Sequence, residues 1–229
     1  DKEGNVYVAD EWLNRISIFS KDGEWIGKWG TEGSGDGEIS KPSGMVFDAD
    51  DNLIMVDSQN NRIQKLTKDG KFISVFGSQG SGDGEFNLPW GICLDKDGNV
   101  FVADWRNDRV QSFSNDGKWL ATFGRPGTGG DCTIAKEQGG MVYVDVPVGQ
   151  FNRPTGVCVD NDGDIYIADW LNNRVQVLTA EGRFITEFTG DAALSSLGVD
   201  KIKSNPDMIR QRNGVRDFTP EKVLWTPCA

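Results

Sequence analysis

The sequence predicts an all-β protein assembled from four similar units, each made of four short antiparallel strands. An Asp closes one apolar run in every unit, at Asp10, Asp57, Asp104 and Asp169. An Arg opens the following run, at Arg15, Arg62, Arg109 and Arg174. Both residues recur with spacings of 47, 47 and 65 positions. Because four strands in about 47 residues make one blade of a β-propeller, the repeat predicts a propeller.

The second unit illustrates how each strand is predicted. Val, Ile, Leu, Phe and Met dominate its apolar runs, and turn residues such as Asp and Gly separate them. The expected strands are Met45–Asp48, Leu53–Val56, Ile63–Thr67 and Phe72–Phe76. Helix is expected only in the long connectors, mainly in the run from Pro206 to Arg212, where Pro stands at the start and Gly214 follows the end.

Composition limits the classes of function. The net charge is −11, from 24 basic and 35 acidic residues, and such a surface repels nucleic-acid backbones. No apolar stretch approaches the length of about 18 residues that a membrane span requires. The chain has no His, which removes the commonest metal ligand and the commonest general base. The four Cys show no CxxC spacing, so a zinc site is not indicated.

The units share the pattern P-x-G-φ-x-x-D-x-x-G-N-φ-φ-φ-A-D-x-x-N-x-R-φ-Q, where φ is apolar. This pattern resembles the NHL repeat and covers most of residues 1–190. The WD40 unit fits less well, because its Gly-His pair requires a His. The resemblance implies a ring that usually has six blades. Residues 1–229 are therefore expected to form one propeller, incomplete at both ends, with insertions at 125–150 and 191–224.

Three charged or Gly-rich motifs have a structural and a functional interpretation. The turn from Asp95 to Asn99 resembles half a calcium loop, but a tight hairpin turn explains its Asp-Gly pair better. The Asp and Arg that recur in every unit favour a bond between strands over a catalytic site, which is needed only once. The GSGDGE runs at 33–38 and 80–85 lack the GK[ST] ending of a phosphate loop, so they are interpreted as connectors.

Exposed aromatic and basic residues are expected on one face of the predicted ring. In a propeller, the connectors between blades share a face with the loops that join the second and third strands. Trp and Arg on such loops are typical of binding hot spots, although packing of the connectors on the ring is the competing explanation. The expected ligand-binding face comprises Trp12, Trp90, Trp105, Arg106, Trp170 and Leu171. The two insertions are expected to form a wall beside it.

The sequence therefore favours a non-catalytic scaffold that binds a protein or peptide, with no cofactor, no metal and no catalytic residue of its own. The alternative is a propeller enzyme of the metal-dependent lactonase or lyase type, its site completed by further blades. Nucleic acid is not favoured as a partner. Cys93 and Cys158 occupy equivalent positions in innermost strands and are interpreted as small buried hydrophobes, whereas Cys132 and Cys228 are expected on exposed connectors.

Overall fold

The computed structural model describes residues 1–124 and 149–188, which form four antiparallel sheets, here called blades 1 to 4. A short parallel pair, β8 (Ser78–Gln79) with β9 (Glu85–Phe86), lies in the connector between blades 2 and 3. Blade 1 consists of β1 (Val6–Asp10), β2 (Arg15–Phe19) and β3 (Trp25–Trp29). Blade 2 consists of β4 (Pro42–Phe47), β5 (Asn52–Asp57), β6 (Arg62–Thr67) and β7 (Phe72–Phe76). Blade 3 consists of β10 (Ile92–Leu94), β11 (Val100–Asp104), β12 (Arg109–Phe113) and β13 (Trp119–Phe123). Blade 4 consists of β14 (Pro154–Val159), β15 (Ile165–Asp169), β16 (Arg174–Leu178) and β17 (Phe184–Phe188).

The repeat predicted the strands of blade 2 to within a few residues, and the same register recurs in every blade. The recurring Asp pairs directly with the recurring Arg across the second and third strands, as Asp57 with Arg62 and Asp104 with Arg109. Each outermost pair of strands carries a one-residue irregularity in register, for example between Lys65 and Leu66. Four copies of one pattern therefore give sheets of the same register, with four strands in blades 2 to 4 and three in blade 1.

Short 3₁₀ turns were not expected from the sequence. Three of them join the second and third strands of blades 2, 3 and 4: η1 (Ser58–Asn60), η2 (Trp105–Asn107) and η3 (Trp170–Asn172). Each ends at a left-handed Asn or Asp, a conformation that these two residues tolerate better than most. The helix expected between Pro206 and Arg212 lies outside the described residues. Across the described part of the chain, no helix is long and apolar enough to cross a membrane.

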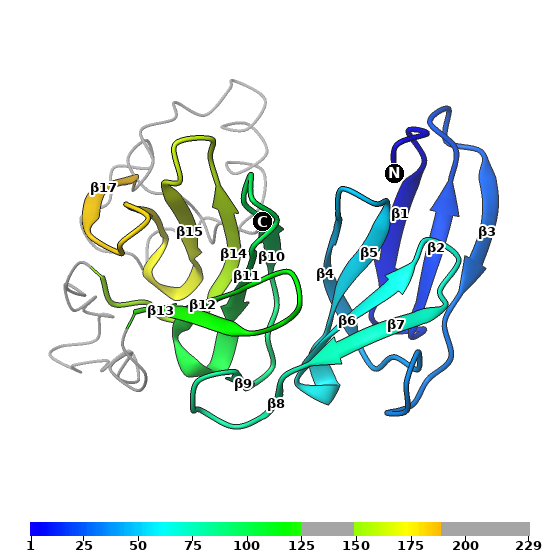
Figure 1. Cartoon of the computed structure of the whole chain (residues 1–229), viewed down its shortest axis with the longest axis horizontal. Coiled ribbons are helices and arrows are strands. Elements are labelled where there is room, and N and C mark those ends of the chain that lie inside the picture. The colour runs from blue at the N-terminus through cyan, green and yellow to red at the C-terminus, as the bar shows by residue number, and fades with distance from the viewer. Residues whose placement is uncertain (125–148, 189–229) are drawn as a thin grey trace, which may run out of the picture.

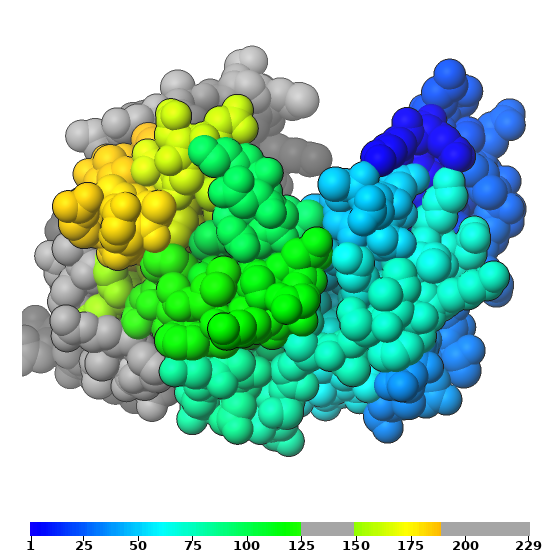
Figure 2. Space-filling view, in the orientation of Figure 1, coloured from blue at the N-terminus to red at the C-terminus, as the bar shows by residue number. Residues whose placement is uncertain are grey.

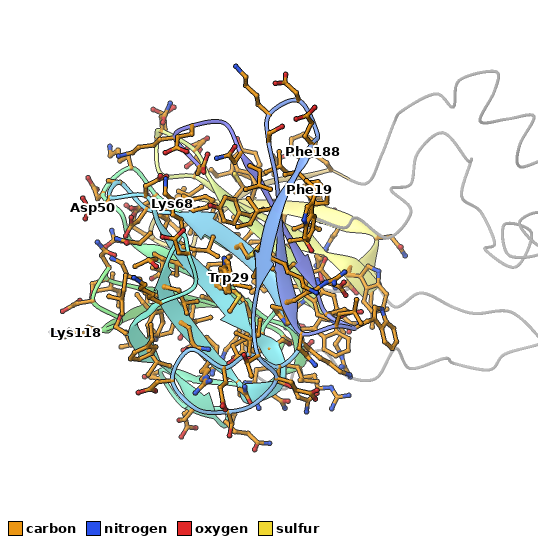
Figure 3. The ribbon with its side chains drawn as sticks, turned by 90° about the vertical axis from the view of Figure 1, so that its right-hand side faces the viewer. Phe19, Trp29, Asp50, Lys68, Lys118 and Phe188 are labelled. Atoms are coloured by element: carbon orange, nitrogen blue, oxygen red, sulfur yellow. The ribbon has the colours of Figure 1, made fainter. Side chains whose placement is uncertain are left out.

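The blades lie side by side around a shared centre, with β4, β10 and β14 toward the inside (Figure 1). Apolar residues fill each space between neighbouring blades. Ile16 of blade 1 packs with Met55 and Leu66 of blade 2, and all three are fully buried. Burial of one such side chain contributes about 1.5–3 kcal/mol. Trp29 of β3 also reaches blade 2, where its Nε1 donates a hydrogen bond to the Lys68 carbonyl at 3.0 Å (Figure 3).

Two Gly residues let the innermost strands approach one another closely. A Cβ atom at Gly44 would lie 2.7 Å from the Trp90 carbonyl oxygen, and one at Gly91 would lie 2.5 Å from the Thr155 carbonyl oxygen. The Gly44 N–H donates to the Trp90 carbonyl at 2.9 Å, so blades 2 and 3 are joined by backbone at the centre. The Gly of the P-x-G pattern is therefore required by packing between blades.

Candidate functional site

The recurring Asp is the centre of a buried hydrogen-bond network, which blade 3 shows most completely. Asp104 Oδ2 accepts hydrogen bonds from Arg109 Nε and Asn107 Nδ2, both at 2.8 Å. Its Oδ1 accepts the Asn87 N–H of the incoming connector at 2.8 Å. Burial raises the pKa of Asp104, and these three donors oppose the rise. Blades 2 and 4 repeat the arrangement around Asp57 and Asp169, which supports the structural interpretation.

The Gly-rich connectors are held by the Arg of the same network. In blade 2 the Arg62 guanidinium donates to the carbonyls of Ser34, Gly35 and Glu38 at 2.7, 2.8 and 2.9 Å. The Glu38 carboxylate in turn accepts the Gly35 N–H at 2.8 Å. The carbonyl oxygens of this loop thus point toward a cation, and the loop's own Glu38 carboxylate accepts one of its N–H groups. A phosphate-binding loop would instead present its N–H groups to an anion, so the geometry matches a blade connector.

The turn that resembles a calcium loop uses its carboxylate internally. Asp95 Oδ1 accepts the N–H groups of Asp97 and Asn99 at 2.9 and 2.8 Å, and Oδ2 accepts Asn99 Nδ2 at 2.8 Å. Gly98 has φ +81°, as a tight turn requires. The Asp-Gly pair therefore closes the hairpin between β10 and β11.

Three Trp of the expected ligand-binding face form a continuous row across blades 3 and 4. The Trp105 ring lies between the rings of Trp90 and Trp170, with centroid distances of 6.1 and 6.4 Å. Two guanidinium groups lie against Trp105: Arg106 at 5.4 Å and Arg153 at 4.7 Å from its centroid. We call these five residues the Trp row. Trp105 and Arg106 lie in η2 and Trp170 lies in η3, whereas Trp90 directly follows Pro89 and Arg153 directly precedes Pro154.

Exposure differs along the expected face. Trp90 and Leu171 are 39% and 37% exposed, whereas Trp105 and Trp170 are half-buried against their neighbours. Trp12 is 83% exposed and projects from the loop of blade 1. The ring contacts above join Trp90, Trp105 and Trp170, and Trp12 takes part in none of them. Of the insertions expected beside this face, only residues 149 and 150 belong to the described part of the chain.

Sequence reasoning missed Arg153. Its backbone N–H donates to Asp108 Oδ1 at 2.8 Å, which fixes the residue beside the loop of blade 3. Burial raises the pKa of Asp108, and the contacts with Arg153 oppose that rise. A signal was present, because Arg153 directly precedes the repeated Pro, and Lys41 holds the same position before Pro42.

A cavity of about 400 Å³ opens beside the Trp row at the centre of the blades. Trp90 forms part of its wall, together with Met45, Ile92 and Val157 from three innermost strands. Blade 1 contributes Glu11, the single carboxylate among the residues that line this cavity. The cavity size lies within the range of small-molecule sites, and its walls are mostly apolar.

The structure corrects the hypothesis for one of the two inner-strand Cys. Cys93 is half-buried against blade 4, and burial raises the pKa of its thiol to about 12. Cys158 is exposed, so the expected burial is wrong for it. The equivalent residues Val46 and Cys93 each pack against the next blade, and no described blade follows blade 4. Cys132 and Cys228 lie outside the described residues.

Comparison with known proteins identifies the repeats. The family model for the NHL repeat matches residues 86–113 and 151–178, and a family model described as a 6-bladed beta-propeller matches residues 1–66. The B-box type zinc finger protein ncl-1 of Caenorhabditis elegans is 56% identical over 36 residues, which is 16% of this chain. The protein brain tumor of Drosophila melanogaster is 48% identical over 40 residues, or 18% of the chain. Each match spans 4% of the relative's own length.

Solved structures share the fold at low identity. A catalytically inactive virginiamycin B lyase from Staphylococcus aureus, solved with quinupristin, has a TM-score of 0.54 and 19% identity. The match covers 81% of this chain and 52% of the lyase. A nidogen/laminin complex gives a TM-score of 0.55 at 18% identity, covering 81% of this chain and 59% of the matched chain. At such identities the similarity concerns the fold alone.

Proposed function

Since this chain is built from NHL repeats that form blades of a β-propeller, we propose that it is a non-catalytic scaffold that binds a protein or peptide ligand. The proposed contact surface is the Trp row together with Leu171. Trp12 is proposed as a separate contact on blade 1.

The Trp row is the observation that supports this proposal most directly. Trp and Arg are the residue types most enriched among interface hot spots. Trp105 carries one aromatic neighbour on each side and two guanidinium groups, so the row is ordered before a ligand arrives. A surface that is already ordered loses less side-chain entropy on binding, which favours affinity.

The recurring polar groups support a scaffold in a second way. Asp57, Asp104 and Asp169 all bond an Arg and a connector N–H of their own blade, so their hydrogen-bonding capacity is used within the fold. The same applies to the carboxylate of Asp95 in its turn. These carboxylates stabilise the blades, and the proposed contacts with the ligand lie on the loops.

A peptide library displayed on phage and selected on the wild-type protein tests this proposal. The selected peptides should bind Trp105→Ala and Trp170→Ala at least about 30-fold more weakly, which corresponds to about 2 kcal/mol. Trp25→Ala is the matched control, because Trp25 is equally large, is exposed and lies on β3 of blade 1. Its affinity should equal that of the wild type.

Thermal unfolding of the same variants separates binding from folding. The melting temperatures of Trp105→Ala and Trp170→Ala should stay close to that of the wild type. A large fall in melting temperature, with affinity reduced only in proportion to the unfolded fraction, would make the Trp row structural and sink the proposal. Preferential binding of a single-stranded RNA oligonucleotide over the peptides would point to nucleic acid instead.

An enzyme is the second candidate, favoured by the similarity of fold to virginiamycin B lyase. The lyase structure described as catalytically inactive is a His-to-Ala variant, whereas this chain has no His at any position. Within residues 1–124 and 149–188, no group of three or more Cys, Asp or Glu residues is placed to hold a metal ion. A metal site built from three or more such side chains would therefore need residues beyond those described.

A further inference from the structure

The two Arg side chains of the Trp row form no ion pair within residues 1–124 and 149–188. Both guanidiniums, of Arg106 and Arg153, lie instead against the ring of Trp105. The net charge of the protein is −11, so carboxylates are abundant, yet none is placed to pair with these two groups in that part of the chain. The other Arg described there each pair with a carboxylate: Arg15, Arg62, Arg109, Arg174 and Arg183.

The repeat does not require aromatic residues at the places of the Trp row. In blade 2, Ser58 holds the position of Trp105, and Ser43 holds the position of Trp90. Ser58 is buried, and η1 forms the same three-residue 3₁₀ turn as η2. Because the loop folds equally well around a small polar residue, the packing of a blade does not account for the Trp side chains.

Hydrogen bonds fix the backbone from which both Arg side chains project. The Arg106 N–H donates to the Asn87 carbonyl at 3.0 Å, and the Arg153 N–H donates to Asp108 Oδ1 at 2.8 Å. Arg106 is exposed and Arg153 is partly exposed. Figure 2 shows blade 3, in green, packed between blade 2, in cyan, and blade 4, in yellow. The loops that carry the Trp row therefore rest on closely packed blades.

The carboxylates nearest to the Trp row have other partners. Asp104 is completely buried and pairs with Arg109. Asp108 is also buried, and its Oδ1 accepts the backbone N–H of Arg153. Neither carboxylate forms an ion pair with the guanidinium of Arg106 or Arg153. The exposed side of the Trp row is therefore a locally positive, aromatic surface on an acidic protein, and such a surface attracts an anionic ligand.

We propose that the Trp row binds an acidic peptide segment with the pattern φ-x-Asp/Glu-x-φ, where φ is apolar. The central carboxylate pairs with Arg106 and Arg153, and the two apolar side chains lie on Trp90 and Trp170. A carboxylate has two oxygens and accepts hydrogen bonds from more than one guanidinium. This inference rests on the function proposed above, because it assigns the ligand chemistry of the same surface.

The spacing of the three Trp rings suits an extended peptide. Alternate residues of an extended segment lie on one side of the chain and are about 6.6 Å apart. The centroid of Trp105 lies 6.1 Å from that of Trp90 and 6.4 Å from that of Trp170. Three alternate side chains can therefore meet three successive rings. The acidic residue takes the central position, because the central ring carries both guanidiniums.

A peptide suits this surface better than a nucleic acid does. Aromatic rings and Arg side chains also bind single-stranded RNA, whose bases stack on the rings. An RNA strand, however, brings one negative charge with every nucleotide, and the net charge of −11 on this protein repels such a polyanion. A peptide with one carboxylate between two apolar residues brings a single charge to the guanidiniums of Arg106 and Arg153.

Three synthetic peptides test the proposal by isothermal titration calorimetry with the whole chain. Their sequence is Ser-Phe-Ser-z-Ser-Leu-Ser, where z is Glu, Gln or Lys. The Glu peptide should bind about tenfold more tightly than the Gln peptide, because it forms charge-assisted hydrogen bonds, and the Lys peptide should bind more weakly than both. In the double variant Arg106→Gln/Arg153→Leu, the three peptides should bind with equal affinity.

The two substitutions are taken from the repeat itself. Gln59 holds the place of Arg106 in blade 2, and Leu88 holds the place of Arg153 in blade 3. Leu88 has φ +49°, close to the +56° of Arg153, so the left-handed backbone accepts this change. The double variant should therefore melt at the wild-type temperature. Arg183→Ala is the matched control, because it removes an exposed guanidinium of blade 4, and it should keep the preference for Glu.

The possible results separate this inference from the proposed function. Equal binding of the Glu and Gln peptides, lost for both in Trp105→Ala, would overturn the acidic pattern and leave the Trp row as a peptide site. A preference for Glu that persists in the double variant would also overturn it.

Absence of binding by all three peptides would overturn the inference, whereas phage-selected peptides that depend on Trp105 would still support the proposed function. If no selected peptide depends on Trp105, both are wrong. Tight binding of a single-stranded RNA oligonucleotide that is lost in the double variant would assign the two Arg to nucleic acid and overturn the peptide proposal.

Discussion

Asp104 and Arg109 form an ion pair with both side chains almost completely hidden from solvent, at 2.8 Å between Oδ2 and Nε. The pair joins two neighbouring strands of one blade and, through the outer nitrogens of Arg109, the connector carbonyls of Ser81, Gly82 and Glu85. One residue thus fixes three segments of chain. Among the described residues no connector carbonyl contacts the equivalent pair in blade 1, Asp10 with Arg15, and this contrast leads to the first prediction.

Replacing Arg109 by Ala should lower the free energy of unfolding by about 3–5 kcal/mol, because Asp104 would remain as an unpaired buried charge. Replacing Arg15 by Ala should cost far less, since Arg15 is partly exposed and, within residues 1–124 and 149–188, is paired with Asp10 and with no connector carbonyl. Urea denaturation of the two variants measures the difference. Equal losses would show that the connector contacts contribute little to stability.

Replacing Gly91 by Ala should destabilise the protein by about 1–3 kcal/mol, because the new methyl group would overlap the Thr155 carbonyl of the neighbouring blade. Gly27 is the matched control. It lies in strand β3, and an added methyl group would meet no atom within 4 Å, so Gly27→Ala should be neutral or slightly stabilising. Melting temperatures decide the matter, and a neutral Gly91→Ala would refute the close-approach argument.

Stability should decrease in acid partly through Asp48. Burial alone would raise the pKa of Asp48, but the Lys65 ammonium at 2.7 Å and the N–H groups of Asn52 and Asp50 outweigh burial and lower it. A carboxylate with a lowered pKa in the folded state stabilises the fold above the unfolded value of about 3.8. That contribution is lost as the pH falls through the folded-state pKa.

The variant Asp48→Asn tests this dependence. The difference in unfolding free energy between wild type and variant should shrink from pH 7 to about pH 3, because the wild-type carboxylate becomes neutral as well. Urea midpoints at a series of pH values measure the difference. A gap that stays constant or widens in acid would contradict the prediction.

Catalysis should be absent when the chain is offered a panel of lactones with added calcium, zinc or manganese. The expectation follows from the lack of His and from carboxylates that are bonded within their own blades. Initial rates with and without protein provide the measurement. Turnover that disappears on replacement of one central Asp or Asn would defeat the scaffold proposal in favour of an enzyme.

The repeating unit could be predicted from the order of the amino acids alone. The spacing of Asp57 and Asp104 predicted the strands, and the Asp-Gly pairs predicted the hairpin turns. The Arg of each unit predicted the bond between the second and third strands. These features depend on residues close together in the chain, whose alternation and turn chemistry are the same wherever the unit lies. The Gly of the P-x-G pattern could also be recognised from the sequence. The close packing between blades that requires this Gly could not.

The residues that pack against each repeat could be identified only in the tertiary structure. Val8 and Met55 hold the same place in the repeat, yet one is exposed and the other fully buried. Cys93 and Cys158 also hold equivalent places, yet Cys93 is half-buried and Cys158 is exposed. The row that places Trp105 between Trp90 and Trp170, with Arg153 against it, also joins residues from two blades. Burial and contact in a propeller depend on the neighbouring blade, and no pattern within one repeat encodes whether that neighbour is present.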